Sequence, residues 1–139
     1  TKFVDIKFEF YCTEKQKLNL HSVISESSAT DQKIKFEEEW KILALDSLFD
    51  VNELKIFLTK EDEDKLEKCK NVKYKEKGDD VGIVKRIIDN KPFFIHRTFA
   101  EYFVAIYIFD VFKKKDEKSL KIIKYFLTFR SLPICKRYV

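Results

Sequence analysis

His96 and Arg97 are the two residues whose types and position point most directly to chemistry. They stand together just before Thr98, where a short apolar run passes into a long one. The backbone N–H groups at the start of a helix carry partial positive charge, so an imidazole and a guanidinium beside them could face an anion. The structural alternative is a histidine that only orders the corner between a strand and a helix. For the chain by itself we prefer this structural interpretation.

Other catalytic and binding motifs are absent from the sequence. A phosphate-binding loop needs the pattern GxxxxGK[ST], and the two glycines are residues 78 and 82. Nucleophile-elbow and HExxH zinc motifs are missing as well. His21 lies in a serine-rich stretch in which nothing marks a catalytic partner. We therefore predict a protein that is not an enzyme, with no catalytic residue, no metal site and no cofactor of its own.

The cysteines Cys12, Cys69 and Cys135 form no CxxC pair, and an odd count does not make a disulfide framework. Reduced thiols in a cytoplasmic protein are the preferred interpretation. One disulfide with one free thiol is the alternative for a secreted protein. Because the chain starts at Thr1 and contains no Met, we expect its original N-terminus to have been removed, so a missing signal peptide does not decide between the two.

Composition favours one packed, mainly helical domain. The 139 residues are 45% hydrophobic and include 14 Phe and 6 Tyr, whereas Gly and Pro number only two each. The 28 basic and 24 acidic residues are interspersed and leave a net charge of +4. A field this weak does not favour nucleic-acid binding, so we expect protein partners, in an oligomeric state that the sequence leaves open.

The elements that must position His96 centre on the run from Phe93 to Phe112. Thr98 and Glu101 have the spacing of a capping box, which predicts a helix that begins at Thr98 or Phe99. Beyond Glu101 this helix is apolar all round, so we expect it to be surrounded by protein or to lack a neighbour. A membrane span needs about 20 apolar residues, whereas only eight separate Glu101 from Asp110.

Periodicity and capping signals predict the remaining elements. The apolar positions of residues 1–16 fit either a helix face or a strand, so periodicity leaves that element open. We expect a mobile serine-rich loop over 17–33, a helix over 34–49 with Trp40 as core anchor, and a short helix over 51–58. Thr59 and Asp62 form a second predicted capping box, which opens a solvated charged helix with Leu66 and Cys69 facing inward. We then expect a polar connection over 71–80, a β-hairpin with strands 83–88 and 93–95, and a helix over 120–131.

A resemblance to a known family rests on the string FIHRTFAEYFVA, residues 94–105. It is similar to the F-x-H-x-[ST]-F-x-E-[FY]-x-A-A segment that ends the nucleotide-binding module of NACHT-type NTPases, STAND proteins of the NOD-like receptor class. Phe94, His96, Thr98, Phe99, Glu101 and Tyr102 carry the match. The stretches EEEWKILALDSLF and GIVKRIIDNKPFFIH resemble the versions in arthropod NACHT proteins that carry ankyrin repeats.

The resemblance implies a winged-helix-like part over residues 34–112, preceded by a helix over residues 1–16 and followed by the start of a helical part over 113–139. It implies that His96 reaches the β-phosphate of ADP in a complete NTPase, and that the helix after it packs against the next helical domain. The phosphate loop and any ankyrin repeat are missing from this sequence. Two functions follow as expectations: a regulatory segment of an innate-immunity NTPase, or a stand-alone, secreted effector that engages a host protein.

Overall fold

The computed structural model describes residues 2–18, 26–76, 78–79 and 81–129. Helices dominate these residues, and the two strands form one antiparallel hairpin, which confirms the predicted mainly α fold with a small β-hairpin wing. The elements are α1 (Lys2–Leu18), α2 (Glu26–Leu48), α3 (Val51–Phe57), α4 (Lys60–Lys68), the π-helical turn η1 (Cys69–Lys73), β1 (Val84–Ile88), β2 (Lys91–Phe94), α5 (Arg97–Lys114) and α6 (Glu117–Phe129).

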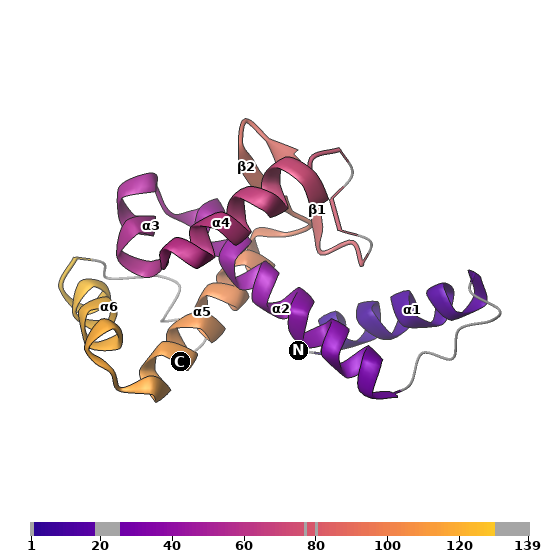
Figure 1. The fold of residues 1–139 in the computed structure, drawn as a ribbon, viewed down its shortest axis with the longest axis horizontal. Helices are drawn as coiled ribbons and strands as arrows, with labels where there is room; N and C mark the ends of the chain where they lie inside the picture. The colour runs from indigo at the N-terminus through magenta and orange to yellow at the C-terminus, as the bar shows by residue number, and fades with distance from the viewer. Residues whose placement is uncertain (1, 19–25, 77, 80, 130–139) are drawn as a thin grey trace.

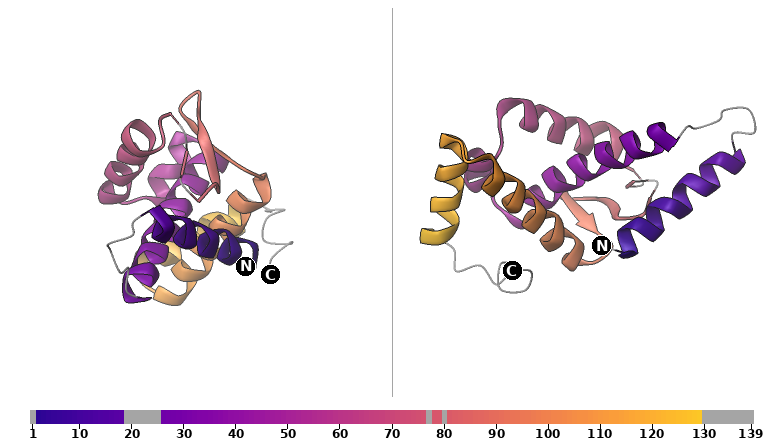
Figure 2. Two further views of the ribbon diagram at one scale, coloured as in Figure 1. Left: turned by 90° about the vertical axis from the view of Figure 1, so that its right-hand side faces the viewer. Right: turned by 90° about the horizontal axis from the view of Figure 1, so that it is seen from below.

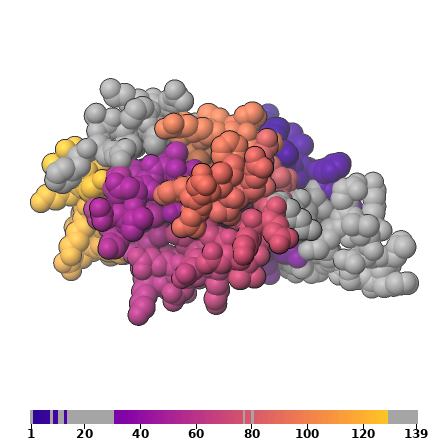
Figure 3. All heavy atoms as spheres, turned by 90° about the horizontal axis from the view of Figure 1, so that it is seen from above, coloured from indigo at the N-terminus to yellow at the C-terminus, as the bar shows by residue number. Residues whose placement is uncertain are grey.

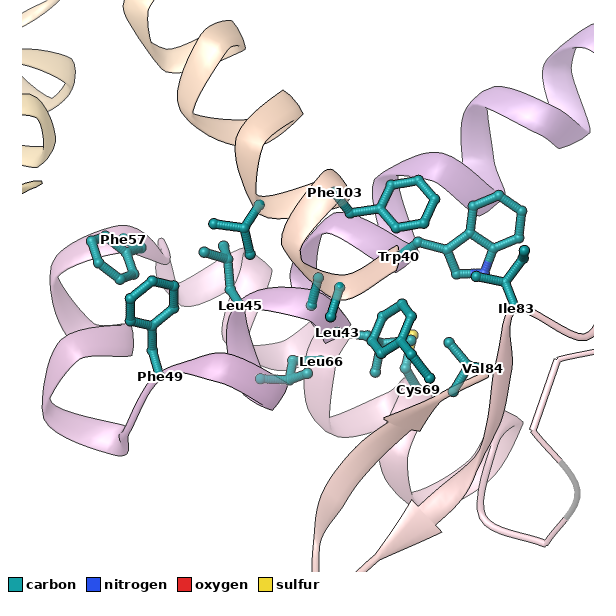
Figure 4. Packing of buried hydrophobic residues seen from close by; sticks show 14 of the residues in the cluster. Trp40, Leu43, Leu45, Phe49, Phe57, Leu66, Cys69, Ile83, Val84 and Phe103 are labelled. Atoms are coloured by element: carbon teal, nitrogen blue, oxygen red, sulfur yellow. The ribbon is translucent and has the colours of Figure 1, made fainter. Parts of the chain in front are cut away.

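The core lies where α2 and the first half of α5 pack together, between the hairpin and α3 (Figure 1). Trp40 is fully buried, as predicted, and its ring centroid lies 5.3 Å from that of Phe103. Figure 4 shows Trp40 between Phe103 on α5 and Ile83 just before β1. One face of α2 therefore joins the long helix to the hairpin.

A second aromatic layer holds α3 against α6. The rings of Phe57 and Phe126 stack 5.1 Å apart, and Phe49 meets both rings edge to face. The Tyr107 hydroxyl donates a 2.9 Å hydrogen bond to the Phe57 carbonyl, so α5 is tied to the same layer. These contacts place α6 at the end of the molecule opposite α1 (Figure 1).

Local capping explains where the short helices begin. The predicted capping box of Thr59 and Asp62 is confirmed: the two residues exchange hydrogen bonds between side chain and backbone at 3.1 and 3.2 Å. Asp50 and Glu53 form a further capping box at the start of α3. Leu66 and Cys69 are buried, as predicted.

The hairpin folds around Asp89 and Asn90, whose φ angles are +49° and +61°. Two consecutive left-handed residues are the signature of a type I′ turn, whose twist matches that of the flanking strands. The Lys91 ammonium donates to the carbonyls of Asp46 and Phe49, which fastens the turn to the end of α2. Figure 3 shows the hairpin and α4 side by side on one face of the molecule.

Two predicted bounds differ from the structure: β2 begins at Lys91 rather than at Phe93, and α6 begins at Glu117 rather than at residue 120, because the Asp116 carboxylate accepts from the Ser119 N–H.

Three further predictions were wrong. Residues 26–33 belong to α2 rather than to a loop, and Lys33 forms an ion pair with Asp5 of α1. Residues 19–25 of the predicted loop lie outside the described residues. Residues 71–80 are not a purely polar connection, because Tyr74 and Asp79 are buried. The Tyr74 ring is buried because it is largely apolar, and the Asp79 carboxylate can be buried because its hydrogen bonds are satisfied. Both residues are therefore buried although their neighbours in sequence are polar.

The third error concerns the start of α5, which begins at Arg97 with His96 as its N-cap. Thr98 lies inside the first turn and is not the cap. The reason is the pairing of the preceding chain: the Ile95 N–H donates a 2.9 Å hydrogen bond to the Ile83 carbonyl. This bond keeps Ile95 beside the hairpin, and the chain then turns directly into the helix.

The expectation that α5 is surrounded by protein holds only for its first half. Ala100, Phe103 and Val104 are buried, whereas Phe109 and Phe112 are 60% and 58% exposed. In the second half Val111 is still buried, so only the side of the helix that carries Phe109 and Phe112 lacks a neighbour among the residues that the structure describes. No helix within the described ranges is long and apolar enough to cross a membrane.

Candidate functional site

His96 lies at the corner between β2 and α5, where the sequence placed the candidate site. Its backbone is extended, with φ −140° and ψ +143°, and its carbonyl accepts a 3.0 Å hydrogen bond from the Phe99 N–H. Its side chain makes no capping hydrogen bond and is exposed. The imidazole is therefore not engaged in capping the helix.

A row of three rings fixes the orientation of this imidazole. The His96 ring stacks on Phe99 at a centroid distance of 6.1 Å, and Phe99 contacts Phe3 of α1 at 5.3 Å. Stacked aromatic pairs add about 0.5–1.5 kcal/mol beyond the area that they bury. Helix α1 thus supports the candidate site, a contact that the sequence did not predict.

Arg97 points into solvent while it holds a buried carboxylate. Its Nε donates a 3.3 Å hydrogen bond to Glu101, one helical turn away, and its side chain is 79% exposed whereas that of Glu101 is 8% exposed. An arginine has five N–H donors in a planar fork, so one bond to Glu101 leaves capacity for an anion in solution.

The other residues of the motif serve the core or the surface. Phe94 is buried with its ring 6.3 Å from Phe103, and Tyr102 meets Phe103 edge to face at 5.2 Å. Partial burial raises the pKa of the Tyr102 hydroxyl. Thr98 is exposed on the first turn. The structure therefore brings His96, Arg97 and Phe99 together at one corner, and it places Phe94, Tyr102 and Trp40 in the packing beneath and beside it.

A buried polar node next to this corner escaped the sequence analysis. The Asp79 carboxylate accepts hydrogen bonds from the Trp40 indole at 2.9 Å, from the backbone N–H groups of Ile83 at 2.9 Å and Val84 at 2.7 Å, and from that of Gly82. Burial raises the pKa of Asp79, and these four donors oppose the rise because they favour the charged form. The signal was present, because an aspartate shortly before a glycine is typical of a side-chain-closed turn.

The charges at the corner are suited to attracting an anion. Two side chains that can carry positive charge stand at the N-terminus of an 18-residue helix, where the backbone dipole has the same sign. In the part of the chain that the structure describes, no group of three His, Cys, Asp or Glu side chains could hold a metal ion. His21, Cys12 and Cys135 lie where side chains are not described.

Comparison with known proteins adds no relative: no protein-family model, no curated protein and no solved structure matches the chain.

Proposed function

We propose that the chain is a non-enzymatic regulatory and protein-interaction segment, resembling the winged-helix part of a NACHT-type NTPase. The observation that carries the proposal is the uncovered face of the second half of α5. An apolar helix is stable when protein surrounds it, and the second half of α5 leaves Phe109 and Phe112 largely exposed.

Phe109 and Phe112 are three residues apart, so their side chains lie on the same face of α5. The Lys113 ammonium stands 4.4 Å from the Phe109 ring centroid, a cation–π contact at the edge of this face. Covering a phenylalanine contributes about 1.5–3 kcal/mol. A partner domain that packs here would gain from both rings, as the resemblance implies for the helical domain that follows in a complete NTPase.

The His96 corner would supply the regulatory half of this function. In a complete NTPase the corner would face the phosphates of ADP, and α5 would link nucleotide state to the packing of the next domain. The present sequence contains no phosphate loop, so we expect no measurable heat when ADP and Mg²⁺ are titrated into the chain. Heat that is present with wild type and lost in His96→Ala would show an autonomous nucleotide site and contradict this expectation.

A capture experiment tests the interaction surface. Wild type, the double variant Phe109→Ser/Phe112→Ser and the control Leu127→Ser are immobilised and exposed to extract at physiological salt. Leu127 is 82% exposed on α6, so Leu127→Ser also removes exposed apolar surface, but on a different helix. We expect a protein that wild type and Leu127→Ser retain and the double variant loses.

Recovery of no specific protein would count against the proposed function. The identity of a retained protein separates the two candidate settings: an NTPase module supports the regulatory segment. A host protein without such a module supports the alternative, a stand-alone, secreted effector that uses the same face.

A further inference from the structure

A groove of about 720 Å³ lies on a different side of the fold, between α2 and the continuous helical segment formed by α4 and η1. Figure 2 shows α4 running beside the middle of α2. One wall carries residues of α2 from Lys35 to Ile42, and the other wall carries residues from Asp62 to Lys73. Neither His96 nor the exposed phenylalanines of α5 contribute to it, so the groove is independent of the surface proposed above.

The floor of the groove is apolar. Ile42 is half-buried, Cys69 is buried as an unpaired thiol, and Val72 is 79% exposed at the lip. Burial raises the pKa of the Cys69 thiol to about 11, so the sulfur is neutral at physiological pH. A floor of this kind binds apolar side chains, and the strong exposure of Val72 leaves apolar surface to be covered.

The acidic residues on the walls are already engaged. Glu38 accepts a 2.9 Å hydrogen bond from Lys41, and Glu39 accepts one from Lys73 at 2.6 Å. Asp62 accepts from the Thr59 N–H in the capping box. Glu38 and Glu39 are therefore each paired with a lysine, and Asp62 caps the start of α4.

The lysines of the walls are less compensated. Lys65 pairs with Glu61 on the outside of α4 at 3.2 Å. Lys35 and Lys68 also line the groove, and among the described residues neither has a carboxylate at ion-pair distance. An apolar floor with uncompensated ammonium groups on both walls is complementary to a ligand that is apolar on one side and acidic at its flanks.

The dimensions of the groove fit a helix. At 1.5 Å per residue, the stretch from Asp62 to Lys73 is about 16 Å long, which is about three helical turns. Two neighbouring helices form a valley in which a third helix can pack at about 8–10 Å from each axis. Recognition of an amphipathic helix in such a groove depends on side chains at positions i, i+3 or i+4, and i+7.

We propose that this groove binds one acidic amphipathic helix of a partner protein. The apolar side chains of that helix would cover Ile42, Cys69 and Val72, and its carboxylates would face Lys35 and Lys68.

The probe for this proposal is a fluorescein-labelled peptide of about four helical turns, with leucines at i, i+3, i+7 and i+11 and glutamates on both flanks. A matched peptide carries lysines in place of the glutamates. Fluorescence polarisation at low salt measures both affinities, because surface charges are screened over about 10 Å at 0.1 M salt. We expect the acidic peptide to bind at least about tenfold more tightly than the basic one.

Two groove variants and one control make the test specific. We expect Val72→Asp and Lys35→Glu/Lys68→Glu each to weaken binding of the acidic peptide at least about tenfold, and the charge-reversed variant to prefer the basic peptide. Lys55→Glu/Lys85→Glu makes the same charge change at two exposed lysines outside the groove and should bind like wild type. Circular dichroism confirms that each variant is folded, which is expected because all five altered side chains lie at least partly in solvent.

Equal binding of the two peptides, undetectable binding of both, or unchanged binding by folded Val72→Asp would overturn the proposal. Sedimentation of the unliganded chain tests the competing occupant. If wild type is a dimer and Val72→Asp is a monomer, the groove is covered by a second copy and the proposal is wrong. A monomeric wild type that binds the acidic peptide supports it.

Discussion

At the scale of single residues, the Asp79 carboxylate joins parts of the chain that are far apart in sequence. It accepts the indole N–H of Trp40 on α2 and the backbone N–H groups of Gly82, Ile83 and Val84 at the entrance to β1. All four partners are donors, so both oxygens must accept. An ionised carboxylate satisfies this requirement, and an amide cannot.

Asp79→Asn is therefore expected to destabilise the protein by about 3 kcal/mol, because an amide N–H₂ would face N–H donors in a buried site. Urea unfolding followed by far-UV circular dichroism measures the change. Asp64→Asn is the control, since Asp64 is exposed on α4 and the same substitution there removes no buried bond. Equal unfolding midpoints for the two variants would show that the Asp79 node contributes nothing.

The burial of a residue could be predicted from the sequence where its own type determines it. The prediction failed where burial depends on partners that are distant in sequence. Trp40 was predicted to anchor the core because a large ring on an apolar helix face has few other roles. Tyr74 and Asp79 sit among charged neighbours, so local composition indicated solvent. Their burial depends on Glu39 and Trp40 of α2, which accept from and donate to them across more than thirty residues.

At the scale of elements, the two glycines on either side of Asp79 have different constraints. Gly78 and Gly82 both have positive φ, at +67° and +83°. A Cβ on Gly78 would overlap the carbonyl oxygens of Val84 and Lys85, because the chain passes directly over β1. A Cβ on Gly82 would meet only the Lys7 ammonium at 3.2 Å, the end of a flexible side chain.

We predict that Gly78→Ala lowers the free energy of unfolding by at least about 3 kcal/mol, because strain and overlap with backbone act together. Gly82→Ala should lower it by only about 1–2 kcal/mol, the cost of a left-handed alanine. Thermal and urea unfolding of the two variants give the comparison. Similar losses for both would mean that the backbone approach at Gly78 can relax.

The boundaries of elements were predictable where the signal is local. The Thr59 capping box and the existence of a hairpin around Asp89 and Asn90 each depend on residues within four positions, and both were predicted, although β2 begins at Lys91 rather than at Phe93. The start of α5 was not, because the hydrogen bond between Ile95 and Ile83 sets it from outside the helix. The capping-box spacing of Thr98 and Glu101 is present in the sequence, but both residues lie within α5, after its N-cap at His96.

At the scale of the whole molecule, α1 lies beside α2 at one end of the fold (Figure 2). Among its described side chains only Val4 is buried, and Phe3, Ile6 and Phe10 are exposed. The ion pair of Asp5 with Lys33 lowers the pKa of Asp5 through a side-chain hydrogen bond. Exposed ion pairs of this kind contribute about 0–1 kcal/mol, so among the described side chains of α1, Val4 and the Phe3–Phe99 contact contribute most to the attachment.

This distribution predicts that α1 opens before the core unfolds. Local opening free energies range from near zero at weakly packed segments to the global value in the core. In native-state hydrogen exchange, amides of residues 9–13 should therefore exchange well before those of Trp40 to Leu45.

Val4→Asp should remove the remaining protection of α1, and the fluorescence of Trp40, the single tryptophan, should keep its buried character. Protection of residues 9–13 equal to that of α2 would mean that α1 is part of the cooperative core. The His96 corner would then be as rigid as the core, because its ring row reaches α1 through Phe99 and Phe3.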